Sequence, residues 1–109
     1  MNEQAVVLIT AVEVPGEADQ SFLAGWERAH DFLLNQPGYR SSRLHRSVEP
    51  GADFRYVNLA VWDSEESFRA ATGRPEFREI GREYPLHSSV YTVISADERW
   101  TPGAHGGQL

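Results

Sequence analysis

The fold of this chain is decided by residues 56–68, which read YVNLAVWDSEESF. At the two-residue period of a β-strand, the first half of this stretch places an amide and an indole, from Asn58 and Trp62, on one face. The alternating positions are all aliphatic, so neither face is typical of a solvent-exposed sheet. Asp63, with Glu66 three residues later, predicts an N-cap, and the strand therefore runs directly into a helix.

The polar pair on this strand is the first candidate for a functional site. An asparagine in the middle of a strand is uncommon, because β-propensity disfavours it, and we interpret Asn58 as functional rather than structural. Trp62 is open to two interpretations, a core aromatic at a strand end or the wall of a pocket. A small pocket between a sheet and its covering helices requires a strand face with such groups.

Length and composition predict one acidic domain without thiol chemistry. The 109 residues include 16 Asp and Glu, 10 Lys and Arg, and no cysteine, which excludes disulfides, thiolate nucleophiles and iron–sulfur clusters. Because basic residues nowhere cluster with aromatics, we expect neither nucleic acid nor a membrane as a partner. No apolar run approaches the ~20 residues of a membrane span and no secretory leader is recognisable, so we expect a cytoplasmic protein.

The remaining elements follow from β-branched runs, apolar stripes at helical spacing, and proline and glycine breaks. They are strands at 5–14, 39–48 and 88–96, a helix from Asp19 to about Asn35, and a short helix between Pro75 and Pro85. The order is then β-α-β-β-α-β with a split second helix, the ferredoxin-like α+β arrangement of an antiparallel sheet with helices on one side. We expect one domain over residues 1–98 and a weakly ordered, glycine-rich tail over residues 99–109.

The first and third strands are apolar on both faces, although the helices can cover only one face of the sheet. A second covering layer is therefore required, since burying apolar surface is worth roughly 25 cal/mol per Å². We expect a homodimer with sheet packed against sheet.

Three segments carry a family resemblance: the turn QPGY at 36–39, the strand VNLAVW at 57–62 and the helix start SEESF at 64–68. With the order of elements, they make residues 5–96 resemble the antibiotic biosynthesis monooxygenase superfamily of small dimeric α/β-barrel proteins. The strongest likeness is to the cofactor-independent monooxygenases of aromatic polyketide pathways. The resemblance implies oxidation of an anthrone- or naphthacenone-type substrate to a quinone by O₂ alone.

The resemblance also implies roles for individual residues. The Asn and Trp of the anthrone enzymes match Asn58 and Trp62, which become the expected catalytic pair. Their Tyr matches Phe68, so the phenol that could donate a proton is missing from this position. Phe68 is then expected to be a wall of the substrate pocket.

The match to the family's arginine is open. An ungapped continuation places it at Arg82, whereas an insertion near Gly73 makes Arg78 or Arg74 an equally good match. We expect an arginine of the second helix region, with Arg82 as the first choice, to contact the substrate.

Other predicted substrate contacts come from the residues themselves. Phe22, Trp26 and His30 follow the apolar stripe of the first helix and should line its inner side. For His30, a core histidine satisfied by a neighbour is the favoured interpretation and a substrate-facing base is the alternative. Tyr56 shares the strand face of the candidate site, and His87, at the entry to the last strand, could overhang the mouth of a pocket.

No cofactor or metal is predicted. The chain lacks a P-loop, a GxGxxG turn and a His/carboxylate cluster at metal-ligand spacing. An oxygenase without flavin, haem or metal needs a substrate that supplies the electrons, and a deprotonated anthrone or hydroquinone can pass one to O₂. Asn58 and Trp62 would then donate hydrogen bonds to the anion and to the peroxide.

Two other functions remain open from the sequence. A non-catalytic binder of an apolar small molecule would need the same pocket. A haem-binding or haem-degrading relative fits less well, because the haem-ligand histidine and the nearby tryptophan of such relatives would fall on Gly81 and Ala71. The favoured hypothesis takes an aromatic small molecule and O₂ as the substrates.

Overall fold

The computed structural model describes residues 4–78 and 83–97. The elements are β1 (Val6–Val12), the 3₁₀ turn η1 (Gly16–Ala18), α1 (Asp19–Leu33), β2 (Tyr39–Arg46), β3 (Tyr56–Trp62), α2 (Glu65–Thr72), α3 (Pro75–Arg78) and β4 (Leu86–Tyr91). Arg82 and the predicted glycine-rich tail, residues 99–109, lie outside the described residues.

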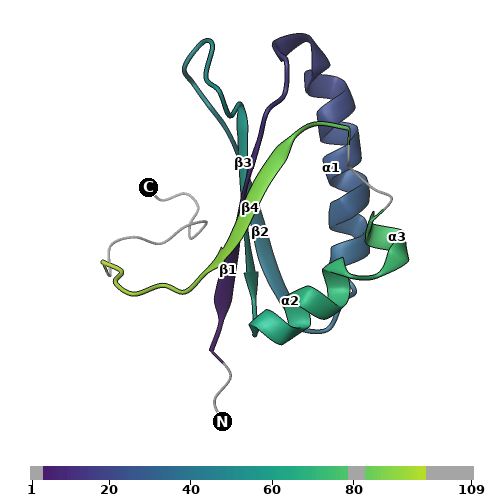
Figure 1. The fold of residues 1–109 in the computed structure, drawn as a ribbon, viewed down its shortest axis with the longest axis vertical. Helices are drawn as coiled ribbons and strands as arrows, with labels where there is room; N and C mark the ends of the chain where they lie inside the picture. Colours follow the sequence, from purple (N-terminus) through teal and green to yellow (C-terminus); the bar gives the residue numbers. More distant parts are fainter. Residues whose placement is uncertain (1–3, 79–82, 98–109) are drawn as a thin grey trace.

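The four strands form one antiparallel sheet in the order β2-β3-β1-β4, and α1, α2 and α3 lie on one side of it (Figure 1). This arrangement confirms the predicted ferredoxin-like α+β fold. The two most apolar strands, β1 and β3, form the central pair, with Val6 opposite Trp62 at one end and Val12 opposite Tyr56 at the other. Within the described ranges, no helix is both long enough and apolar enough to cross a bilayer.

The start of α2 differs from the sequence prediction. The N-cap of α2 is Ser64, not Asp63, and the Ser64 hydroxyl accepts a hydrogen bond at 3.1 Å from the backbone N–H three residues later. Asp63 instead pairs with Arg40 of β2. Helix α1 begins at Asp19 as predicted, and its N-cap, Ala18, has no polar side chain to cap the helix. The carboxylate of Asp19 is directed to the sheet.

Strand β4 is shorter than predicted. It ends at Tyr91, where the prediction extends to residue 96. Tyr91 pairs with Val7, so Val6 is the only residue of β1 that remains beyond this pair. Val93 and Ile94 are consequently exposed, Ile94 by 94%.

The turn between α1 and β2 requires glycine at position 38. Gly38 has a φ of +88°, and a Cβ atom there would lie 2.4 Å from the side chain of Ser67. The Gly38 carbonyl also accepts a hydrogen bond from the backbone N–H of Asp63. The glycine thus lets this turn pack directly against the start of α2.

The core between the sheet and the helices is divided into two clusters. Each contains a buried aromatic residue from one end of β3, Trp62 in one cluster and Tyr56 in the other. Phe68 of α2 packs in the first cluster and Val12 of β1 in the second. Neither cluster includes Asn58, which lies between them on β3, and this gap is where the site is found.

The start of α1 is anchored to the sheet by Asp19. Its carboxylate accepts two hydrogen bonds from the Arg55 guanidinium and one from the Tyr56 hydroxyl, each of 2.8 Å. The Arg55 guanidinium foremost, and then the Tyr56 hydroxyl, hold the pKa of Asp19 well below its ordinary value of 3.8. The N-terminal end of α1 is therefore held in place by charge-assisted hydrogen bonds.

The face of the sheet away from the helices is aliphatic along its two central strands. The side chains on it are Val7, Ile9 and Ala11 of β1 and Val57, Leu59 and Val61 of β3. No described helix covers this face (Figure 1). A second copy of the chain is the covering layer that the sequence predicts for this face.

We predict that Asp19→Asn lowers the melting temperature at pH 7, because Arg55 and Tyr56 lose a charged acceptor. The folded-state pKa is depressed, so the contribution of Asp19 is complete above the unfolded-state pKa of about 3.9 and is lost as the pH falls below it. The difference in melting temperature between wild type and variant should shrink from about pH 5 to pH 2, as measured by calorimetry. Asp31→Asn, at an exposed carboxylate of α1, is the matched control, and an equal effect there would refute the anchor.

We also predict a homodimer in which a second copy covers the aliphatic face. Light scattering at micromolar concentration should give twice the monomer mass, and Leu59→Lys should shift it to the monomer, because the lysine would be buried without a partner. Leu34→Lys makes the same change where the leucine is 54% exposed, at the end of α1, and should leave the dimer intact. A monomeric wild type would contradict the prediction.

Candidate functional site

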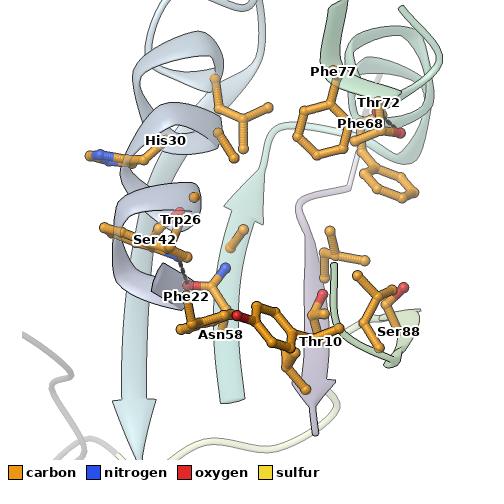
Figure 2. Close-up of a pocket in the computed structure, with 18 of the residues that line it drawn as sticks. Thr10, Phe22, Trp26, His30, Ser42, Asn58, Phe68, Thr72, Phe77 and Ser88 are labelled. Carbon is orange, nitrogen blue, oxygen red and sulfur yellow. Dashed lines mark hydrogen bonds between the residues drawn. The ribbon is translucent and has the colours of Figure 1, made fainter. Parts of the chain in front are cut away.

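A cavity of about 330 Å³ lies between the sheet and the helices. Its floor is formed by β1, β3 and β4, and its walls are α1 on one side and α2 with α3 on the other (Figure 2). The walls are apolar, with Phe22 and Leu33 from α1 and Phe68 and Phe77 from the two shorter helices. The volume is near the lower end of the range for small-molecule sites, so the cavity suits a compact, largely apolar ligand.

The side chain of Asn58 is held by Trp26 at the α1 side of the cavity. The indole N–H of Trp26 donates to the side-chain oxygen of Asn58 at 3.1 Å, which joins α1 to the middle of β3 (Figure 2). Because an indole N–H can only donate, the amide atom that faces it must be the oxygen. The amide nitrogen points away from Trp26 and has no hydrogen-bond partner among the described residues. Asn58 thus offers the cavity a donor.

Trp62 carries a second unused donor. The residue is fully buried, and its ring packs edge-on against Tyr39 and Phe68, with centroid distances of 5.4 and 6.2 Å. Its indole N–H has no hydrogen-bond partner in the described part of the chain. An unpaired buried donor costs roughly 1–3 kcal/mol, so an acceptor that reached this N–H would be bound favourably.

Four of the predicted substrate contacts line the cavity together with the predicted catalytic pair. They are Phe22, Trp26, His30 and Phe68. The His30 ring stacks on Trp26 with 4.9 Å between the ring centroids. His30 therefore supports the indole that orients Asn58, as well as facing the cavity.

Tyr56 and His87 are not among the cavity residues, although the sequence prediction placed them there. The Tyr56 hydroxyl is turned to the start of α1, where it is bonded to Asp19. His87 pairs with Ala11 and so belongs to the opposite face of the sheet, where its ring contacts the Glu13 carboxylate at 2.8 Å. A shift of one residue along a strand moves its side chain to the other face of the sheet. His87 lies next to a loop, where no periodic pattern of apolar residues indicates which face it occupies.

None of the described arginines lines the cavity. Arg74 and Arg78 are exposed near α3, and Arg74 pairs with Glu76 at 3.5 Å. Arg82, the first choice for the family's arginine, lies outside the described residues.

Sequence reasoning missed several hydroxyl groups of the cavity, among them those of Thr10, Ser88 and Tyr84. Thr10 did carry a signal, because it interrupts the otherwise apolar strand VVLITAV. Tyr84 carried none, since its position on an apolar stripe says nothing about its phenol. In the structure that phenol is bonded to Ser21 of α1 at 3.1 Å.

Metal-ligand chemistry has no evident site in residues 4–78 and 83–97, where no group of three or more His, Asp or Glu side chains could hold an ion. The described lining offers instead an apolar space with hydrogen-bond donors on its floor. Such a space can bind a flat molecule and stabilise negative charge on one of its oxygens.

Solved structures of modest sequence identity share this fold. A candidate monooxygenase from Shewanella loihica PV-4 is 31% identical over 88% of this chain and 100% of that chain, with a TM-score of 0.78. SnoaB, a cofactor-independent oxygenase from Streptomyces nogalater, is 27% identical over 85% and 96%, with a TM-score of 0.71. MhuD, a haem degrader from Mycobacterium tuberculosis with two haems bound in its active site, is 26% identical over 84% and 98%, with a TM-score of 0.66. A search of curated proteins found no significant match.

A family model gives the assignment. The model described as antibiotic biosynthesis monooxygenase matches residues 5–83, which extend from the start of β1 past the end of α3. The match contains the strand and helix of residues 56–68 and therefore both Asn58 and Trp62. The chain belongs to the antibiotic biosynthesis monooxygenase family.

Proposed function

We propose that this protein is a cofactor-independent monooxygenase that oxidises an anthrone-type polycyclic phenol to a quinone with O₂. Its family and its likeness to SnoaB support an oxygenase. The observation that carries the proposal is the fixed donor of Asn58 in a largely apolar cavity. Such a cavity favours a flat aromatic ligand with an oxygen that gains negative charge.

The substrate supplies the electrons in this reaction, since O₂ reacts slowly with closed-shell molecules. An anthrone loses a proton to give a delocalised anion, which passes one electron to O₂. The two radicals combine to form a C–O bond, and the resulting peroxide takes up a proton. Cleavage of the O–O bond with loss of the remaining C–H hydrogen then releases water and leaves the quinone carbonyl.

The cavity residues act on charge and position. Asn58 donates to the oxygen of the anion and so lowers the pKa of the bound substrate. The apolar walls strengthen this hydrogen bond because they exclude water. Trp26 holds the amide in its donating orientation, and Trp62 supplies its unpaired N–H to the developing peroxide.

The proton for the peroxide needs a source other than position 68, where Phe68 has no acidic hydrogen. Tyr56 is unsuitable, since its hydroxyl is already bonded to Asp19. Tyr84 is a phenol that does line the cavity, but its hydroxyl already donates to Ser21, and we therefore assign the proton to water.

Two alternatives are outcomes of the same tests. A non-catalytic binder of an apolar molecule would use this cavity without turnover. The likeness to MhuD makes haem the other candidate ligand. In that case His30, which lines the cavity in the described part of the chain, would be the imidazole available to the haem.

We predict that Asn58→Ala and Trp62→Phe each lower oxygen consumption on dithranol by at least about tenfold, because each removes one donor to developing charge. The assay is an oxygen electrode without added flavin, metal or haem, corrected for spontaneous oxidation of the same anthrone. Asn35→Ala, the same change at an exposed residue beyond α1, should retain wild-type turnover. Wild-type turnover no faster than background would favour the binder, and turnover that requires hemin would favour the haem alternative.

Trp26→Phe should lower turnover less than Asn58→Ala, because the amide remains but can rotate. The double variant should be no slower than Asn58→Ala alone, since Trp26 acts through Asn58. A separate readout is the pH at which bound dithranol ionises, followed under nitrogen by the absorbance of its anion, which should rise in Trp26→Phe. Additive losses in the double variant, with an unchanged ionisation pH, would contradict the positioning role.

A further inference from the structure

Three polar side chains form one row across the floor of the cavity. Thr10 of β1 is paired with Asn58 of β3 on one side and with Ser88 of β4 on the other. All three line the cavity, Ser88 at its exposed end (Figure 2). Neighbouring strands lie about 4.8 Å apart, so the row presents three hydrogen-bonding groups at that spacing.

The row is polar, whereas the two rows of residues beside it on the sheet are largely apolar. The row on one side consists of Val90, Leu8 and Ala60, and the row on the other side of Leu86, Val12 and Tyr56. The only hydroxyl in these two rows, that of Tyr56, is bonded to Asp19. The hydroxyls of Thr10 and Ser88 and the amide nitrogen of Asn58 have no partner among the described residues. Among the described residues only the Trp62 indole N–H is a buried polar atom without a partner, so water can reach the three groups of the row. A ligand with matching oxygens can take the place of that water.

The row also has a direction. Asn58 turns its donating amide nitrogen to the cavity, because Trp26 holds its oxygen, whereas the hydroxyls of Thr10 and Ser88 can donate or accept. On the β2 side of Asn58 the next residue is Leu44, so the polar row ends there. A matching ligand edge carries a carbonyl or phenolate oxygen at Asn58 and further oxygens toward β4.

We propose that this row binds one edge of a fused-ring ligand whose oxygens occupy alternate positions along that edge. The separation of two such oxygens, with one ring position between them, matches the spacing of about 4.8 Å between neighbouring strands. Thr10 is the centre of the row, so a ligand that contacts two adjacent members always contacts Thr10. The proposal rests on the proposed function only for the class of ligand, a polycyclic aromatic molecule. It does not depend on the oxidation, because binding requires none.

Two isomeric probes distinguish the effect of oxygen spacing on binding from the effect of hydrophobicity. In 1,8-dihydroxyanthraquinone both hydroxyls lie on one edge, at alternate positions with a carbonyl between them, whereas in 1,5-dihydroxyanthraquinone they lie on opposite edges. Each hydroxyl neighbours a carbonyl in both isomers, and neither quinone is a substrate for the proposed oxidation. Equilibrium dialysis, read by the visible absorbance of the quinone, gives the two dissociation constants.

The wild-type protein should bind the 1,8 isomer about threefold to tenfold more tightly than the 1,5 isomer, the effect of one further hydrogen bond. Thr10→Val keeps the shape but removes the hydroxyl, and should reduce this ratio to about one while binding of the 1,5 isomer changes less than about twofold. Thr10→Ser restores a hydroxyl and should restore the preference. Ser89→Ala is the matched control, because Ser89 pairs with Ile9 and belongs to the opposite face of the sheet.

The outcomes distinguish this proposal from the proposed function. A wild-type protein without isomer preference, or one that binds neither quinone, overturns the role of the row, as does a preference that persists in Thr10→Val. A preference that depends on Thr10 supports the row even if dithranol oxidation does not exceed background, in which case the oxygenase proposal alone fails.

Discussion

The hydrogen bond between Trp26 and Asn58 joins the two layers of this protein at the border of the space that a ligand would occupy. As a neutral hydrogen bond it contributes only about 0.5–1.5 kcal/mol to stability. Its chemical consequence is larger, because it determines which atom of the amide faces the cavity. His30, stacked on Trp26, extends the same support along α1. The helix is therefore part of the site through its effect on a strand residue.

The divided core explains why a cavity persists beside well-packed side chains. Tyr56 and Trp62 close the two ends of β3, and each is almost inaccessible to solvent. They differ in their polar atoms, since the Tyr56 hydroxyl is bonded to Asp19 and the Trp62 indole N–H is unpaired. Native proteins rarely leave a buried donor without a partner. The end of β3 at Trp62 is therefore the one where an additional hydrogen-bond acceptor is expected.

The two faces of the sheet meet different requirements through adjacent residues. Asn58 faces the helices and the cavity, while Leu59, the next residue, belongs to an aliphatic face that no described helix covers. Strand alternation makes this separation automatic. Under the proposals for ligand and dimer, substitutions on one face should change ligand binding without changing assembly, and the reverse should also hold.

The sequence by itself determined the element order, the sheet with helices on one side, and the placement of Asn58 and Trp62 on the helix-facing side. These features depend on local periodicity, turn residues and chain connectivity, all of which are written in short stretches such as residues 56–68. Only the tertiary structure decided that Trp26 orients Asn58, that Asp19 engages Tyr56 rather than capping α1, and that His87 faces away from the cavity. The row of Asn58, Thr10 and Ser88 was equally hidden, because strand register brings together residues that are far apart in the chain. Register depends on the packing of the whole sheet, and no single segment contains that information.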